Sequence, residues 1–151
     1  QIFLHDIRER ALVEAKVRFK RAGVQNVQFL HSSSPSLKKL KKKCEWVFVD
    51  APCSGTGTLR RNPDMKYRFD QKMLEELQGK QRNIFEKALS FVKPGGKIIY
   101  ATCSILKEEN EDQAAFFLEH LPVTKVKDSF QSLPKEGEMD GFFGIIFQKN
   151  T

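Results

Sequence analysis

Short apolar segments alternate with amphipathic helical segments along this chain, and this alternation constrains its fold more than any other feature. Apolar residues at helical spacing predict helices over residues 7–22, 70–92 and 108–120. The runs between them predict strands over residues 2–4, 27–30, 46–49, 97–100, 123–127 and 142–148. Repeated strand–helix units indicate an α/β fold with a mostly parallel sheet and helices on both faces. We expect the last two strands to form an antiparallel hairpin.

Two local signals bound the longest predicted helix. Asp70 is expected to cap its N-terminus, a common role for Asp. Lys93-Pro94-Gly95-Gly96 is expected to turn the chain into the next strand.

The composition is ordinary for a soluble globular protein, with 40% hydrophobic and 30% charged residues in a chain of 151. No apolar run approaches the roughly 20 residues that a membrane helix needs, and the first residues lack signal-peptide features. Three cysteines are too few for a disulfide framework, which favours a reducing compartment. We therefore expect a cytoplasmic location, or a nuclear or nucleolar one in a eukaryote, and no membrane partner.

Asp6 follows the first predicted strand, where nucleotide-binding α/β folds hold a ribose by its hydroxyls. Such an acidic residue normally belongs to the second strand, about 20 residues after a Gly-rich turn. The chain contains no such turn before Asp6, so we expect residues 1–151 to be the C-terminal part of a catalytic domain whose first strand and Gly-rich loop are missing. The alternative is that Asp6 is only a helix N-cap.

Two cysteines stand in loops that directly follow predicted strands. Cys53 lies in Asp50-Ala51-Pro52-Cys53-Ser54-Gly55-Thr56-Gly57, and Cys103 lies in Ala101-Thr102-Cys103-Ser104. Loops at the carboxyl ends of parallel strands converge on one crevice, so we expect both thiols at one reactive site. The third cysteine, Cys44, is interpreted as a small buried hydrophobic residue. The three histidines have no metal-ligand spacing with the cysteines, and we expect no metal site.

The charge distribution permits a nucleic-acid partner. The net charge is +7, and much of the excess lies in a lysine-rich run at residues 38–43, which is typical of a solvated surface. The cations that follow the Cys53 loop are more informative, because they flank the expected site and an aromatic residue lies among them. We expect these cations to contact RNA phosphates: Arg60, Arg61, Lys66 and Arg68.

The two cysteine motifs, together with Arg60-Arg61-Asn62-Pro63-Asp64, Glu108-Glu109-Asn110-Glu111 and Asp140-Gly141-Phe142-Phe143, resemble the Nol/Nop/Sun (Fmu) family of RNA cytosine-5 methyltransferases. The resemblance runs from Asp6 to the C-terminus. It implies a Rossmann-like class I methyltransferase fold that uses S-adenosylmethionine and acts on ribosomal or transfer RNA.

The resemblance also implies residue roles. Cys103 would be the nucleophile, Cys53 would assist product release, and Asp50 would contact the target cytosine near the methyl donor. The implied cofactor-binding residues are Asp6, Ser33, Asp50 and Pro52. Ser33 is the nearest counterpart of an Asp with which the family usually contacts adenine, and a hydroxyl binds an amine more weakly than a carboxylate does.

The chemistry gives these residue types a purpose. Carbon 5 of cytosine is too electron-poor to take a methyl group unaided, and a thiolate that adds at carbon 6 makes it nucleophilic. A second group must then help to expel the thiolate. The reverse assignment, with Cys53 as nucleophile, is the arrangement of DNA cytosine methyltransferases, and the chemistry alone leaves it open; the resemblance favours Cys103. The alternative function is a non-catalytic RNA-binding or scaffold domain with the same fold.

Overall fold

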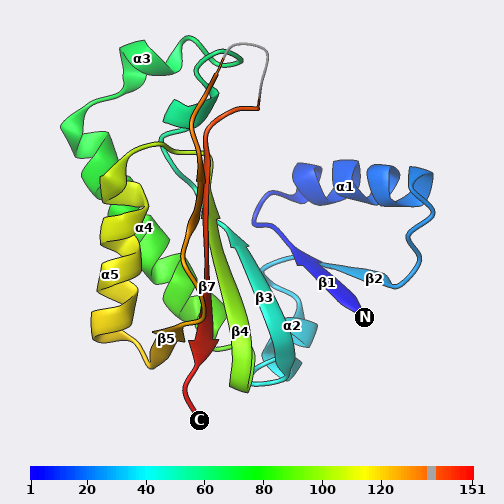
Figure 1. The fold of residues 1–151 in the computed structure, drawn as a ribbon. Helices are drawn as coiled ribbons and strands as arrows, with labels where there is room; N and C mark the ends of the chain where they lie inside the picture. Colours follow the sequence, from blue (N-terminus) through cyan, green and yellow to red (C-terminus); the bar gives the residue numbers. More distant parts are fainter. Residues whose placement is uncertain (136–138) are drawn as a thin grey trace. The chain divides into compact units, whose positions relative to one another are not determined.

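The computed structural model describes residues 1–135 and 139–151. They form two compact units, residues 1–41 and residues 42–151 (Figure 1). The first unit consists of β1 (Ile2–His5), α1 (Glu9–Arg21), β2 (Val27–Leu30) and the short helix α2 (Pro35–Lys39).

The first unit is a strand–helix–strand unit, as the sequence predicts. β1 and β2 pair in parallel, with Ile2 opposite Val27. Phe19 of α1 packs edge-on against Phe29 of β2, with 5.7 Å between the ring centroids. The helix stops before Gly23, whose backbone φ of 71° favours glycine. The helix predicted over residues 7–22 is therefore confirmed, with its ends at Glu9 and Arg21.

The second unit holds the remaining elements. They are β3 (Cys44–Asp50), η1 (Thr56–Thr58), α3 (Met65–Arg68), α4 (Gln71–Leu89), β4 (Val92–Thr102), η2 (Lys107–Glu109), α5 (Glu111–His120), β5 (Val123–Lys125), β6 (Phe130–Ser132) and β7 (Phe142–Lys149).

The sheet of this unit is mixed. Its strand order is β3-β4-β7-β5, and β6 also pairs with β7. β3 and β4 are parallel, whereas β7 runs antiparallel to β4, β5 and β6. The predicted antiparallel arrangement of the last strands is confirmed, with β6 as an additional short strand that the sequence pattern does not indicate.

The core lies between this sheet and its two long helices, α4 and α5, which cover the same face (Figure 1). Phe85 of α4 stacks on Phe117 of α5 with 3.9 Å between ring centroids. Tyr100 of β4 packs edge-on against both rings. All three side chains have no exposed area. Burying aromatic side chains of this size contributes much of the stability of a small domain, so the end of β4 is held firmly in place.

The predicted boundaries differ from the structure most clearly around α4, β4 and α5. α4 ends at Leu89, and Val92 belongs to β4 rather than to the helix. Residues 93–96 do not separate the helix from the strand; they form an irregularity inside β4, where the register moves from Cys44 opposite Val92 to Trp46 opposite Lys97. Gly95 takes a positive φ there, which permits the local bend. The last long helix starts at Glu111, after the 3-10 turn η2.

The predicted cap of α4 is confirmed. The Asp70 side chain accepts a hydrogen bond of 2.7 Å from the backbone N–H of Met73. Among the described residues, we find no helix with the length and apolar character required to cross a membrane.

Candidate active site

The two cysteine loops leave the same edge of the sheet because β3 and β4 are parallel neighbours. Asp50 lies opposite Ala101 in the register, and Ala51 donates its N–H to the Ala101 carbonyl at 2.9 Å. The sulfur atoms of Cys53 and Cys103 lie 3.3 Å apart, and both cysteines are free thiols. The structure therefore brings the two cysteines together, as the sequence predicts.

The two thiols have different acidities. The pKa of Cys103 is lowered to about 7 because Cys53 donates a hydrogen bond to its sulfur, although burial and the charge of Asp50 oppose the shift. The pKa of Cys53 is raised far above its ordinary value by the same hydrogen bond, and further by burial. The thiolate is the nucleophilic form of cysteine, and the electrostatics of the pair favour that form at Cys103 over Cys53.

A cluster of hydroxyl groups joins the two cysteine loops by hydrogen bonds. The Oγ atom of Ser104 lies 3.3 Å from Ser54 Oγ and 3.1 Å from Thr56 Oγ1. Thr56 Oγ1 also accepts the N–H of Ile105 at 3.2 Å. Ser54 and Ser104 are fully buried. The sequence analysis missed this cluster; its signal is a hydroxyl residue directly after each cysteine.

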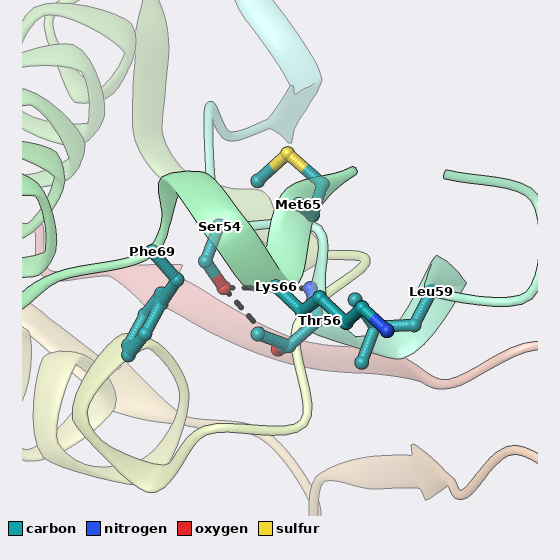
Figure 2. Close-up of a pocket in the computed structure, with 6 residues that line it drawn as sticks. All are labelled: Ser54, Thr56, Leu59, Met65, Lys66 and Phe69. Carbon is teal, nitrogen blue, oxygen red and sulfur yellow. Dashed lines mark hydrogen bonds between the residues drawn. The ribbon is translucent and has the colours of Figure 1, made fainter. Parts of the chain in front are cut away.

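A pocket of about 230 Å³ opens beside the Cys53 loop. Its lining residues are Ser54, Thr56, Leu59, Met65, Lys66 and Phe69. Figure 2 shows Ser54 and Thr56 joined by hydrogen bonds on the loop, with Met65 and Lys66 contributed by α3. The pocket combines apolar walls with one cation, a pairing that suits a nucleobase with its phosphate.

The four cations expected to bind RNA fall into two pairs. Arg60 and Arg61 both form ion pairs with Asp140, a carboxylate with only 4% of its side chain exposed. Lys66 lies on α3 with its ammonium 4.8 Å from the centre of the exposed Tyr67 ring, and Arg68 ends α3 with an exposed side chain. The arginine pair therefore has a structural partner, which sequence reasoning missed.

Asp6 and Ser33, the residues expected to hold the cofactor's ribose and adenine, belong to the first unit. Asp6 follows β1 and accepts hydrogen bonds from the backbone and guanidinium of Arg8 at 2.8–3.0 Å. The Arg8 hydrogen bond lowers the pKa of Asp6 to about 2. The N-cap of α1 is Arg8 rather than Asp6, so the simple helix-cap role does not describe Asp6. Ser33 is exposed, and its Oγ lies 3.0 Å from His31 Nδ1.

A family model for the 16S rRNA methyltransferase RsmB/F matches residues 1–148. The chain belongs to this family. The RsmB/F chain is also similar to curated proteins named Ribosomal RNA small subunit methyltransferase B. That of Salmonella newport (strain SL254) is 36% identical over 146 aligned positions, which cover 91% of this chain and 34% of that protein. That of Klebsiella pneumoniae is 36% identical over 151 positions, covering 95% and 35%. The chain spans about a third of the length of these relatives.

Solved structures share the fold of this chain. The crystal structure of PH0851 has a TM-score of 0.89 at 29% identity and covers 99% of this chain and 37% of that one. NSun6 from Pyrococcus horikoshii, solved with SFG, has a TM-score of 0.86 at 23% identity, covers 100% of this chain and 42% of that one, and shows the same fold. The expected Rossmann-like methyltransferase fold is confirmed. The match to methyltransferases points to S-adenosylmethionine, the usual methyl donor, as the cofactor.

Within residues 1–135 and 139–151, no group of three or more His, Cys, Asp and Glu side chains is arranged to hold a metal ion.

Proposed function

We propose that this RsmB/F chain carries the catalytic residues of a ribosomal RNA (cytosine-5)-methyltransferase. The 3.3 Å contact between the sulfur atoms of Cys53 and Cys103 is the observation that supports this best. Two thiols in contact but of unequal acidity suit a reaction that forms a bond to a base and later breaks it. The names of the matching family and of the curated relatives favour ribosomal RNA as the substrate.

In the first step, the Cys103 thiolate adds to carbon 6 of the target cytosine. A carbon–sulfur bond forms, and the electron pair of the carbon 5–carbon 6 double bond moves toward carbon 5 and the ring's nitrogen 3. The carboxylic acid form of Asp50, which ends β3 beside the Cys53 loop, would donate a hydrogen bond to nitrogen 3 and relieve the negative charge that develops there. Carbon 5 thereby becomes nucleophilic.

S-adenosylmethionine, when bound, supplies the methyl group that carbon 5 takes up. The residues present fit this cofactor in part. Asp6 follows β1 with its carboxyl pKa near 2 and a side chain that is 26% exposed, so it can accept ribose hydroxyls. Ser33, which belongs to the same unit as Asp6, would hydrogen-bond the adenine amine.

In the release step, Cys53 removes the proton from carbon 5. Once Cys103 is bonded to the base, its sulfur no longer accepts the hydrogen bond that raises the pKa of Cys53 most, so Cys53 can lose its own proton to water. The Cys53 thiolate then takes the carbon 5 proton. The electrons of that C–H bond restore the ring double bond, and the pair of the carbon–sulfur bond returns to Cys103.

The segment after the Cys53 loop would contact the RNA strand. Lys66 lines the pocket beside the loop, and the neighbouring Tyr67 exposes 79% of its surface. A cation and an exposed aromatic ring are the groups that bind a phosphate and stack on an unpaired base. Arg68 would add a second phosphate contact.

Mass spectrometry of ribosomal RNA tests the proposed function. RNA from cells that lack the gene should lose one or more 5-methylcytidines, which return with the wild-type gene but not with a Cys103→Ala gene. Unchanged 5-methylcytidine in the gene-deficient cells would contradict the proposal. Full restoration by Cys103→Ala would instead favour a non-catalytic RNA-binding role.

A further inference from the structure

Two consecutive buried polar residues, Glu109 and Asn110, lie where η2 meets α5. Neither has any exposed area. A carboxyl or amide group removed from water is tolerated only when hydrogen bonds replace the lost hydration. The side chains of both residues find these bonds outside their own helix, in the two cysteine loops.

Glu109 holds the loop of Cys53. Its Oε1 accepts the backbone N–H of Ser54 at 2.9 Å, and its Oε2 accepts the Ser54 hydroxyl at 2.5 Å. Gln81 of α4 completes the arrangement, because its amide donates to Glu109 Oε1 and to the Pro52 carbonyl, both at 3.0 Å. The residues on both sides of Cys53 are therefore fixed by buried side chains.

Asn110 holds the loop of Cys103 in the same way. Its Oδ1 accepts the Thr102 hydroxyl at 2.6 Å, and its Nδ2 donates to the Ser104 carbonyl at 2.9 Å. Asn110 is also the N-cap residue of α5, yet its side chain makes no capping bond. The side chain supports the residues on both sides of Cys103 instead.

We propose that Glu109 and Asn110 are positioning residues that together fix the separation of the Cys53 and Cys103 sulfur atoms. Glu109 and Asn110 are adjacent in one buried segment, so each cysteine loop is hydrogen-bonded to the same short stretch of backbone. A shift of one loop would therefore have to move the residue that holds the other loop. The inference rests on the proposed function, in which both thiols act on one base. Misplacing a reacting group by about 1 Å can reduce a rate about 10²-fold.

A purely electrostatic role for Glu109 predicts the opposite effect. The charges of Asp50 and Glu109 raise the pKa of Cys103, whereas the hydrogen bond from Cys53 lowers it. If Glu109 acted only by its charge, Glu109→Gln would lower this pKa and speed alkylation of Cys103. If Glu109 positions the loop, the substitution loosens the contact between the sulfur atoms, raises the pKa and slows alkylation.

The test is the rate of iodoacetamide alkylation at Cys103 against pH, read by mass spectrometry of the Cys103 peptide. We expect Glu109→Gln and the uncharged Asn110→Leu to slow the reaction at about pH 7 by at least about tenfold, as the thiol returns toward its ordinary pKa of about 8.5. Two exposed residues of the same types provide matched controls: Glu108→Gln and Asn83→Leu should match the wild type.

Wild-type or faster alkylation in both folded variants would overturn the positioning role. The alkylation assay uses neither RNA nor cofactor, so a failure of the positioning role in this assay would leave the proposed methyl transfer standing. Unchanged 5-methylcytidine in gene-deficient cells would instead contradict the proposed methyl transfer and would leave the positioning role standing. Circular dichroism reports folding. If either variant does not fold, Thr102→Val carries the test. It removes the hydroxyl that donates to Asn110 and accepts the backbone N–H of Ser104, and it should slow alkylation several-fold; an unchanged rate would likewise overturn the proposal.

Discussion

Gly141 donates its backbone N–H to the carbonyl oxygen of Gly57 at 2.9 Å, which fastens the segment that enters β7 to the loop that carries Cys53. Gly57 in turn donates its N–H to the Cys103 carbonyl at 3.0 Å. Three backbone segments thus meet at the thiol pair. Their close approach requires glycine, because a Cβ on Gly57 would lie 2.8 Å from the Cys103 oxygen.

Gly57→Ala should therefore disturb both the fold and the site. We expect the free energy of unfolding to fall by about 1–3 kcal/mol, as for other overpacked positions, and methyl transfer to fall with it. Gly144→Ala is the matched control, because a Cβ at Gly144 of β7 meets nothing within 4 Å. Equal stability of the two variants in urea unfolding would contradict the prediction.

Asp140 should make Arg60 and Arg61 partly redundant for stability. When one arginine is removed, the buried carboxylate of Asp140 keeps its ion pair with the second arginine. We expect the free energy of unfolding to fall by less than about 1 kcal/mol. The Arg60→Ala/Arg61→Ala double variant removes both of these ion pairs from the Asp140 carboxylate, and its free energy of unfolding should fall by about 2 kcal/mol or more. Additive losses in a double-mutant cycle would argue against a shared carboxylate, and Arg68→Ala serves as the exposed control.

Lys66 should affect RNA binding without affecting stability. Lys66→Ala is expected to weaken RNA affinity and to reduce the slope of log affinity against log salt by about 0.7–1, the effect of one lost phosphate contact. Lys72→Ala, at an exposed position in α4, is the matched control. An unchanged slope, measured by filter binding at several salt concentrations, would remove Lys66 from the RNA interface.

Asp6 should stabilise the chain in a pH-dependent way. Its pKa is near 2 in the folded chain, below the ordinary value of about 3.9, so its contribution is present above about pH 4 and is lost as the pH falls through the folded value. After allowance for solvent screening, we expect Asp6→Asn to lower the free energy of unfolding by about 1 kcal/mol at neutral pH. The loss should disappear near pH 2. Urea unfolding at both pH values measures this, and an equal loss at both would count against it.

The sequence predicts most of what depends on local pattern. The strand at β3 and the Asp70 cap follow from apolar periodicity and side-chain chemistry. The convergence of Cys53 and Cys103 follows because parallel strands place their ends at one edge. Local pattern fails at Val92, which continues the helical spacing but belongs to β4, because pairing with β3 outweighs that spacing.

Contacts between distant residues are what the sequence leaves undetermined. Glu109 and Ser54 are 55 residues apart, and nothing in their local sequence indicates that they meet in a buried hydrogen bond. The same holds for Arg60 and Asp140, which are 80 residues apart. The sequence predicts Arg60 to be an RNA contact because it shows the charge of this residue but does not indicate that Asp140 is its ion-pair partner.

The most direct measurement of the thiol roles is the covalent RNA–protein adduct on a denaturing gel. The intact protein, its Cys53→Ala variant and its Cys103→Ala variant would each be incubated with ribosomal RNA and S-adenosylmethionine. Cys53→Ala should accumulate an adduct, because Cys103 can still attack the base while release is impaired. Cys103→Ala, and the double variant, should form none. An adduct that forms with Cys103→Ala, or none with Cys53→Ala when the wild-type protein is active, would contradict the assignment of Cys103 as nucleophile and Cys53 as the releasing group.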